Sequence, residues 1–372
     1  MRFPEFSGEW KMCTIGELIT KVGSGVTPRG GEAVYKTEGH PFVRSQNVGL
    51  GNLLLDDIAF IDEETHLRQK NTELQFNDVL LNITGASIGR SALVDKQIVG
   101  GNVNQHVCII RTKENLVPSF ICSFLLSNYG QRQIDSFQAG GNRQGLNFEQ
   151  IKSIKITIPS KDEQIKIAKL LRAIDERIAT QNKIIEKLQS LIKGLRVCCM
   201  QRNGSNNVYL SEIAQIYQPQ TISSAELTED GFLVYGANGI IGKYKDYNHK
   251  TEQICITCRG NTCGMVNYTK PMSWITGNAM VINTDKYQDK VCKRYLYHYL
   301  SAYNFNSIIS GSGQPQIVRT PLEKLKITLP TISEQKQKAI IFDKIQDKID
   351  INHKVLNLYI GQKQYLLRQM FI

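Results

Sequence analysis

Several features that mark common protein classes are missing from this sequence. No run of about 18 apolar residues occurs, so we expect no membrane-spanning helix and no membrane partner. The first residues, MRFPEFSGEWKM, lack the apolar core of a signal peptide. The nine cysteines are scattered, mostly in apolar strings such as HVCII and FICSFLL, which is typical of reduced core cysteines. These features predict a cytoplasmic chain.

Motifs of catalysis are also missing. The string nearest to a Walker A loop, ANGIIGKY, has Ala237 in place of the first glycine and Tyr244 in place of Ser or Thr. No G-x-G-x-x-G follows a predicted strand, and the Asn/Asp-Pro-Pro-aromatic motif of amino-methyltransferases does not occur. Cys255, Cys258 and Cys263 lack a second pair with zinc spacing. We therefore predict no catalytic residue, no metal site and no cofactor in this chain.

The charge balance points to a class of partner. Of the 372 residues, 45 are Lys or Arg and 34 are Asp or Glu, which gives a net charge of +11. A basic chain without a secretion signal is a candidate for binding a polyanion such as nucleic acid. Many unrelated proteins are basic as well, so charge alone does not decide the partner.

The clearest pattern is an internal repeat. The phrase KITIPSKDEQ (155–164) recurs as KITLPTISEQ (326–335). Further upstream, ITGASIGRSALV (83–94) resembles TCRGNTCGMVNY (257–268), and Gly85 and Gly89 correspond to Gly260 and Gly264. Landmarks that keep the same order in both halves indicate a tandem duplication.

Each copy combines an α+β region with one long helix. Short β-type runs such as DVLLNIT, HVCIIRT and AMVIN alternate with Gly- and Asn-rich turns. The predicted class is α+β, with two similar α/β domains separated by two long antiparallel coiled-coil helices in a pseudo-two-fold repeat. The expected boundaries are residues 1–160 (head 1), 161–199 (central helix), 200–330 (head 2) and 331–372 (distal helix).

The two long helices carry apolar residues at heptad spacing, which favours pairing with another helix. The seam of the first helix comprises Ile167, Leu171, Ile174, Ile178, Gln181, Ile185, Leu188, Ile192 and Leu195. The equivalent seam of the second comprises Lys338, Phe342, Ile345, Ile349, Asn352, Leu356, Tyr359, Lys363 and Leu366. An antiparallel alignment places Gln181 opposite Asn352, and a buried amide pair would fix the register. The alternative is that each amide faces solvent.

Loops in both copies are rich in side chains that read base edges and hold phosphates. Arginine reads guanine and Asn or Gln reads adenine through paired hydrogen bonds in the major groove. In head 1 the candidates are Arg29, Arg44, Gln46, Asn47, Arg90, Asn102, Asn104, Gln105, Asn142, Arg143 and Gln144. In head 2 they are Asn238, Arg259, Asn261, Thr262, Asn278, Gln314 and Gln316. The string TGASIGR (84–90) could also cradle a phosphate, although a tight turn would need the same glycines.

These motifs resemble the specificity (S) subunit of type I restriction–modification systems. The resemblance covers nearly the whole chain and depends most on the repeated proline-to-helix phrase, with the RFPEFSGEW start in support. It implies two target recognition domains that bind the two halves of a bipartite site in double-stranded DNA. It also implies methyltransferase (modification) subunits, two of them, that use S-adenosylmethionine, and restriction/translocase subunits that use ATP and Mg²⁺.

Head 2 is shorter than head 1 and differs from it in nearly every loop, which predicts an asymmetric target. Two other functions stay open at this point. One is the DNA-reading part of a standalone methyltransferase or nuclease, which would need a cofactor motif in the same chain. The other is a coiled-coil scaffold that does not bind DNA.

Overall fold

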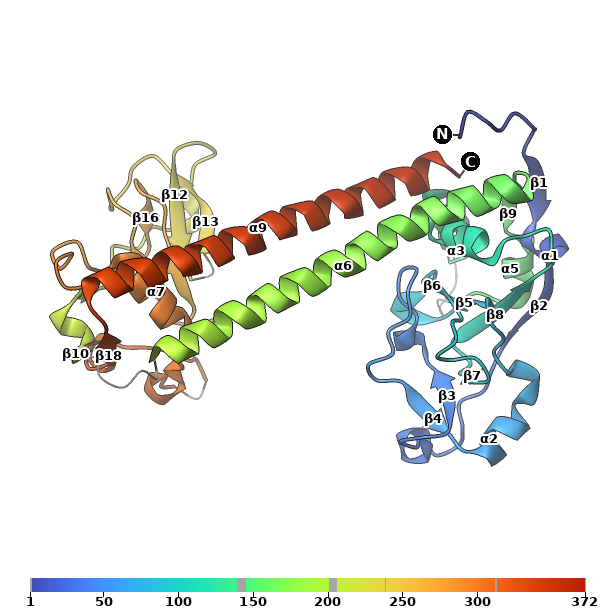
Figure 1. The fold of residues 1–372 in the computed structure, drawn as a ribbon, viewed down its shortest axis with the longest axis horizontal. Helices are drawn as coiled ribbons and strands as arrows, with labels where there is room; N and C mark the ends of the chain where they lie inside the picture. The colour runs from blue at the N-terminus through green and yellow to red at the C-terminus, as the bar shows by residue number, and fades with distance from the viewer. Residues whose placement is uncertain (1, 139–144, 201–205, 238, 312, 372) are drawn as a thin grey trace. The chain divides into compact units, whose positions relative to one another are not determined.

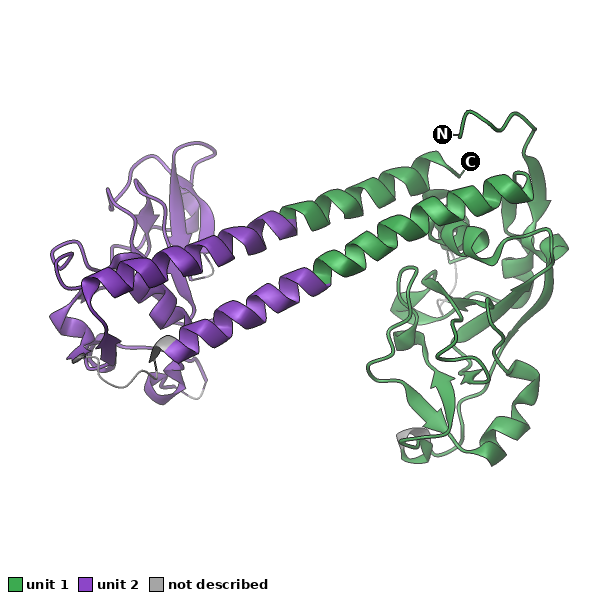
Figure 2. Cartoon of the chain, in the orientation of Figure 1, with its two compact units in different colours: residues 1–182, 354–372 green, residues 183–353 purple. Residues whose placement is uncertain are grey.

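The computed structural model describes residues 2–138, 145–200, 206–237, 239–311 and 313–371. The chain forms two compact units (Figure 2). Unit 1 comprises residues 1–182 and 354–372, and unit 2 comprises residues 183–353. Each unit therefore contains one head together with parts of both long helices.

Head 1 contains three small sheets and several short helices (Figure 1). The four-stranded antiparallel sheet has the order β2 (Ile19–Ser24), β8 (Val107–Thr112), β5 (Val79–Asn82) and β6 (Ser91–Leu93). The three-stranded sheet has the order β4 (Ala59–Ile61), β3 (His40–Val43) and β7 (Asn102–Val103), and β1 (Lys11–Thr14) pairs with β9 (Lys155–Ile158). The helices are α1 (Ile15–Leu18), α2 (Glu63–Arg68), α3 (Pro118–Leu126), α4 (Asn128–Ser136) and α5 (Phe148–Ser153).

Head 2 repeats this topology strand for strand. Its four-stranded sheet has the order β11 (Gln215–Tyr217), β17 (Ala279–Asn283), β14 (Ile254–Thr257) and β15 (Val266–Tyr268). Its three-stranded sheet has the order β13 (Gly239–Tyr244), β12 (Phe232–Gly236) and β16 (Trp274–Ile275), and β10 (Asn206–Tyr209) pairs with β18 (Lys326–Leu329). Its helices are α7 (Lys293–Ala302) and α8 (Arg319–Glu323). The shared strand order confirms the duplication.

The core of each head follows from the two-residue period of its central strands. In β5, Val79 and Leu81 pack with the aromatic residues of α3, whereas Leu80 packs in a second cluster that includes Val43 and Val103 of the three-stranded sheet. In β14 the same alternation places Ile254 and Ile256 in one cluster and Cys255 in the other. The central sheet is thus covered on both faces, which explains why all four residues of β5 are buried.

The long helices are α6 (Lys161–Met200) and α9 (Ile332–Gln369). Every predicted seam residue of both helices is buried or half-buried. In unit 1 the start of α6 shares a core with the end of α9, where Leu171 and Leu366 lie in one cluster and Lys363 Nζ lies 2.6 Å from Asp175 Oδ1. In unit 2 the end of α6 packs with the start of α9, through Ile192 and Phe342 among others.

These contacts, within each unit, confirm that the two helices run antiparallel. Gln181 and Asn352 are each 8% exposed, so neither seam amide faces solvent. Their contact with each other stays a prediction.

Candidate nucleic-acid interface

The strand pairing of head 1 brings its candidate loops to one edge of the sheets. Ser24 at the end of β2 pairs with Cys108 near the start of β8, and Val107 pairs with Asn82 at the end of β5. The loops after β2 and β5 and the loop before β8 therefore emerge on the same side. The loop after β3 joins them, because Asn82 Nδ2 donates to the carbonyl oxygen of Ser45 at 2.8 Å. We call residues 25–31, 44–47, 83–90 and 104–106 the reading edge of head 1.

Head 2 forms the equivalent edge by the same pairing. Tyr217 at the end of β11 pairs with Val281, and Thr257 at the end of β14 pairs with Ala279 at the start of β17. A further loop joins this edge, since the backbone N–H of Gly260 donates to the carbonyl oxygen of Pro315 at 3.0 Å. The reading edge of head 2 comprises residues 218–223, 237, 258–265, 276–278 and 314–317.

The repeated glycines build the same tight turn in both edges. Gly85 and Gly89 have φ of 69° and 85°, and Gly260 and Gly264 have φ of 85° and 91°, in the left-handed region that glycine favours. The N–H of Gly89 donates to Asn82 O at 3.0 Å, and that of Gly264 donates to Thr257 O at 2.9 Å. Because the N–H groups of residues 88, 89 and 90 all bond within the turn, they are not free for a phosphate. The glycines of TGASIGR thus serve a turn.

Three of the candidates in head 1 are held by a carboxylate that the sequence did not single out. Asp57 Oδ1 accepts from Asn47 Nδ2 at 2.9 Å, and its carbonyl oxygen accepts from an Arg44 N–H at 2.6 Å. Gln46 Nε2 also donates to the Asp57 carboxylate. Arg44 has 16% of its side chain exposed, and Asn47 is fully buried. The prediction that Arg44 and Asn47 present free base-reading groups is therefore wrong, whereas Gln46 is exposed and its contact with a base stays a prediction.

Two more asparagines are structural. Asn102 is fully buried, with Oδ1 2.7 Å from His66 Nδ1 and Nδ2 donating to Gln69 O at 3.0 Å. Asn104 is 6% exposed, and its Oδ1 accepts from the backbone N–H of His106 at 3.0 Å. Neither side chain can reach a base edge, so both predictions were wrong.

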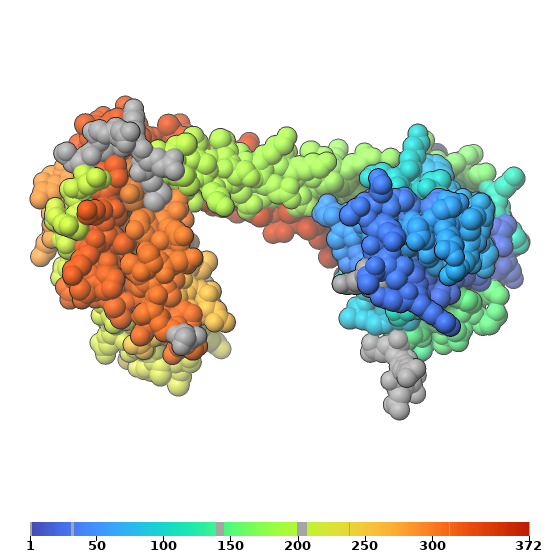
Figure 3. All heavy atoms as spheres, turned by 90° about the horizontal axis from the view of Figure 1, so that it is seen from below, coloured from blue at the N-terminus to red at the C-terminus, as the bar shows by residue number. Residues whose placement is uncertain are grey.

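The remaining described candidates of head 1 fit an interface. Arg29, Arg90 and Gln105 are exposed. Within the described ranges, neither arginine makes a hydrogen bond or ion pair through its guanidinium. In the space-filling view of Figure 3, the blue N-terminal part of the chain lies on the near face of unit 1, beside cyan and green segments. Base contacts by these side chains stay a prediction.

Head 2 gathers its candidates more closely. Arg259 and Gln316 lie on adjacent backbone segments that form a β-bridge, and the N–H of Cys258 donates to Asn278 O at 3.1 Å. The exposed candidates on this edge are Arg259, Asn261, Asn278, Gln314 and Gln316, and Thr262 is half-buried. Loops that are distant in sequence thus present guanidinium and amide groups side by side.

Four candidates, Asn142, Arg143, Gln144 and Asn238, lie outside the described residues. The segment that begins at residue 145, directly after the first three candidates, makes the same backbone contact as its counterpart in head 2. Leu146 N donates to Ile83 O at 2.8 Å, as Ile317 N donates to Cys258 O at 3.0 Å.

The strand register also shows which positions correspond between the heads. Thr84 is the counterpart of Arg259, Arg90 of Met265, and His106 of Asn278. His106 and Met265 were not among the sequence candidates, because a lone His or Met next to a strand carries no motif, and Thr84 entered only as the first residue of the string TGASIGR. The reading edges therefore share a backbone but differ in side-chain chemistry.

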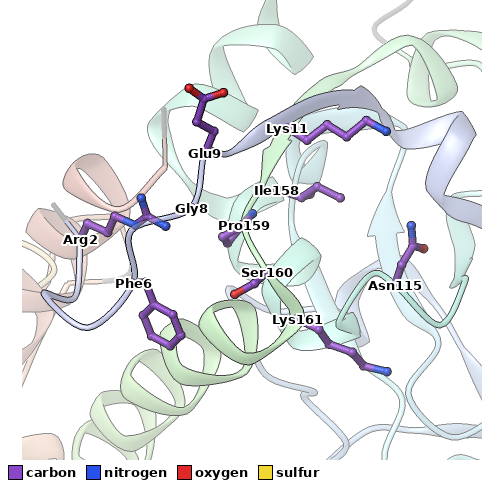
Figure 4. A pocket seen from close by; sticks show the side chains of 10 residues that line it. All are labelled: Arg2, Phe6, Gly8, Glu9, Lys11, Asn115, Ile158, Pro159, Ser160 and Lys161. Carbon is purple, nitrogen blue, oxygen red and sulfur yellow. The ribbon is translucent and has the colours of Figure 1, made fainter.

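The pocket in Figure 4 lies elsewhere in unit 1. It has a volume of about 460 Å³ and is formed by the N-terminal segment, the end of β9 and the start of α6. Arg2, Lys11 and Lys161 line it together with Glu9. None of its lining residues belongs to the reading edge of head 1.

Two properties of the described part of the chain bear on other functions. No helix there is long and apolar enough to cross a membrane. No group of three or more His, Cys, Asp or Glu residues there could hold a metal ion.

Burial raises the pKa of the Cys108 thiol to about 12 and that of Cys122 to about 11, which fits cysteines that pack in a core.

Comparison with known proteins agrees with this architecture. The chain is 23% identical to the putative type I restriction enzyme MjaX specificity subunit of Methanocaldococcus jannaschii, over 94% of this chain and 90% of that protein. Its fold is similar to that of the S subunit of a type I restriction–modification system from M. genitalium, with a TM-score of 0.68, 17% identity and coverage of 100% of this chain and 99% of that one. A chain from a structure of the type I R-M system matches with a TM-score of 0.58 and 15% identity over 98% of this chain and 97% of that one.

The family model for the type I restriction modification DNA specificity domain matches twice, at residues 7–190 and 203–358. The two matches fall on the two copies of the repeat. The chain therefore belongs to the family of type I restriction–modification DNA specificity domains.

Proposed function

We propose that this chain is the DNA specificity subunit of a type I restriction–modification complex, in which each head binds one half of a bipartite target. The observation that carries the proposal is the pair of reading edges. Each presents exposed polar side chains from several loops on a rigid sheet, and the duplicated fold supplies two of them. Sequence-specific readers need hydrogen-bonding groups held in fixed positions, and strand ends supply such positions.

The proposed target is asymmetric. At matched positions head 1 carries Thr84 and Arg90 where head 2 carries Arg259 and Met265. A hydroxyl, a guanidinium and a thioether make different contacts with base edges, because only some of them donate hydrogen bonds. Two heads with different side chains would therefore bind two unrelated half-sites.

The net charge of +11 supports binding to DNA, since basic side chains at phosphates release counterions. We assign no catalysis and no cofactor to this chain. Methyl transfer would belong to modification subunits, two of them, which bind S-adenosylmethionine. DNA translocation and cleavage would belong to restriction subunits that use ATP and Mg²⁺.

Co-expression with a type I modification subunit from the same genome, followed by methylation mapping of host DNA, tests the proposal. We expect one bipartite motif with two different halves. Exchange of head 1 for that of a relative should change one half and leave the other intact. A map without a motif would contradict the proposal.

DNA-binding and methylation assays on the same proteins also distinguish the proposed function from a DNA-free scaffold and from a standalone methyltransferase. A DNA-free scaffold would show no salt-dependent DNA binding, whereas a DNA reader should lose affinity steeply as salt rises. A standalone methyltransferase would modify DNA without any partner subunit.

A further inference from the structure

The loop before β8 contains a chain of hydrogen bonds that fixes the orientation of one exposed amide. The backbone N–H of Thr27 donates to Gln105 Oε1 at 2.9 Å, and the Thr27 hydroxyl contacts the same oxygen. A backbone N–H can only donate, so the atom that faces it is the amide oxygen. Both donors of Thr27 thus use the oxygen of Gln105.

The amide nitrogen is fixed from the other side. Gln105 Nε2 lies 3.1 Å from His106 Nε2, and because an amide nitrogen only donates, this ring nitrogen accepts. The other ring nitrogen, His106 Nδ1, lies 2.6 Å from Thr84 Oγ1 and carries the proton that it donates. Thr84, His106, Gln105 and Thr27 therefore form one connected chain across the reading edge of head 1.

The Gln105 amide therefore has a free hydrogen-bond donor but no free acceptor. The oxygen already accepts two hydrogen bonds, and one of the two N–H groups is used by His106. The remaining N–H belongs to an exposed side chain on the reading edge. An adenine contact through both atoms of a glutamine needs the oxygen as well, and Thr27 occupies that oxygen.

We propose that Gln105 acts only as a hydrogen-bond donor and recognises one acceptor on a base edge, the O6 or N7 of guanine, the N7 of adenine or the O4 of thymine, within the half-site of head 1. This inference rests on the proposed function and adds the chemistry of one contact. It is specific to head 1, because the position that matches Gln105 in head 2 is Gly277, which has no side chain.

The test uses the complex of the full chain with its modification subunit and a duplex that carries the methylation motif mapped for the parent. Gln105→Glu keeps an acceptor for Thr27 but removes the free donor. Gln105→Lys keeps a donor and removes the acceptor. The matched controls are Gln75→Glu and Gln75→Lys, because Gln75 is exposed at the opposite, amino end of β5 and the charge changes are equal.

The measured quantity is the ratio of specific to non-specific affinity. Relative to the Gln75 controls, Gln105→Glu should lower this ratio about tenfold or more, whereas Gln105→Lys should stay within about threefold of the parent. Equal losses for both Gln105 variants would overturn the inference, because they would mean that both amide atoms are needed. No loss for Gln105→Glu would overturn it as well. A parent complex without any methylation motif would instead refute the proposed function.

Discussion

Gln164 and Gln335 make the same three hydrogen bonds at the starts of the two long helices. Gln164 Oε1 accepts from Val117 N at 2.9 Å, and its Nε2 donates to Asn115 O and Pro159 O, each at 3.1 Å. Gln335 Oε1 accepts from Cys292 N at 2.8 Å, and its Nε2 donates to Lys290 O at 3.1 Å and Pro330 O at 2.9 Å. Each glutamine is 1% exposed. The repeated phrase therefore has a structural role, which is to connect each long helix to its head.

Replacement of either glutamine by leucine should destabilise its own unit. Gln164→Leu leaves one buried N–H and two carbonyl oxygens without this partner, which costs about 1–3 kcal/mol in the free energy of unfolding. The two tryptophans allow the units to be followed separately, since Trp10 lies in unit 1 and Trp274 in unit 2. Urea unfolding of a Trp274→Phe background reports on Gln164→Leu, and a Trp10→Phe background reports on Gln335→Leu.

The controls are Gln362→Leu for unit 1 and Gln337→Leu for unit 2, because each glutamine is exposed on α9 within the unit that its tryptophan reports on. We expect changes within about 0.5 kcal/mol for these surface variants. Equal effects of buried and exposed substitutions would show that the shared hydrogen bonds do not matter.

A buried histidine should make unit 2 sensitive to acid. His298 on α7 is fully buried, with Nε2 donating to Asp343 Oδ1 at 2.7 Å and Nδ1 2.8 Å from an Arg196 N–H group. Burial lowers the pKa of His298 to about 4, and Asp343 only partly opposes this. The unfolded chain takes up a proton near pH 6.5, so the stability of unit 2 should fall as pH drops from about 6.5 to 4. The expected loss is on the order of 2–3 kcal/mol.

Urea unfolding at several pH values, followed through Trp274, measures this loss. His249 also lies in unit 2, and burial lowers its pKa, so the comparison with His298→Gln isolates the effect of His298. The variant should be less stable at pH 7 but lose less stability between pH 6.5 and 4. Parallel pH profiles for parent and variant would contradict the assignment.

The comparison of sequence and structure separates two kinds of information. The duplication, the long helices and their seam follow from periodicity, and residues such as Ile167 and Ile192 lie where the heptad places them. Periodicity does not show which polar side chains are free to contact DNA. Asn102 is held by His66, which is 36 positions away, and Arg196 contacts His298 across 102 positions. Partners at such separations are set by tertiary packing, which local patterns do not encode.

On the DNA side, Arg259→Ala should weaken specific binding without unfolding the protein. Arg259 is exposed on the reading edge of head 2. If it binds guanine, its loss should cost about 1–3 kcal/mol and relax specificity at one position of one half-site. If it binds phosphate, affinity for all sequences should fall and the salt slope should decrease by about one. The measurement is duplex binding at several salt concentrations.

Arg172→Ala is the matched control, because Arg172 has 79% of its side chain exposed on α6, outside both reading edges. We make the same prediction for Arg143→Ala in head 1, which lies outside the described residues. Parent-like binding and methylation by both the Arg143 and Arg259 variants would place the DNA-binding face elsewhere.

The last prediction concerns the two buried amides of the helix pair. Gln181 and Asn352 occupy equivalent seam positions and are equally buried, so we expect their side chains to contact each other. The double variant Gln181→Cys, Asn352→Cys should form a disulfide under mild oxidation, detected by mobility on a non-reducing gel. The control variant Asn182→Cys, Asn352→Cys moves one thiol to an exposed neighbouring position and should cross-link far less. Gln181→Leu with Asn352→Leu should preserve or raise the thermal midpoint while loosening the register, because a buried amide pair specifies alignment at some cost in stability. Equal cross-linking by both cysteine pairs would show that the amides do not define the register.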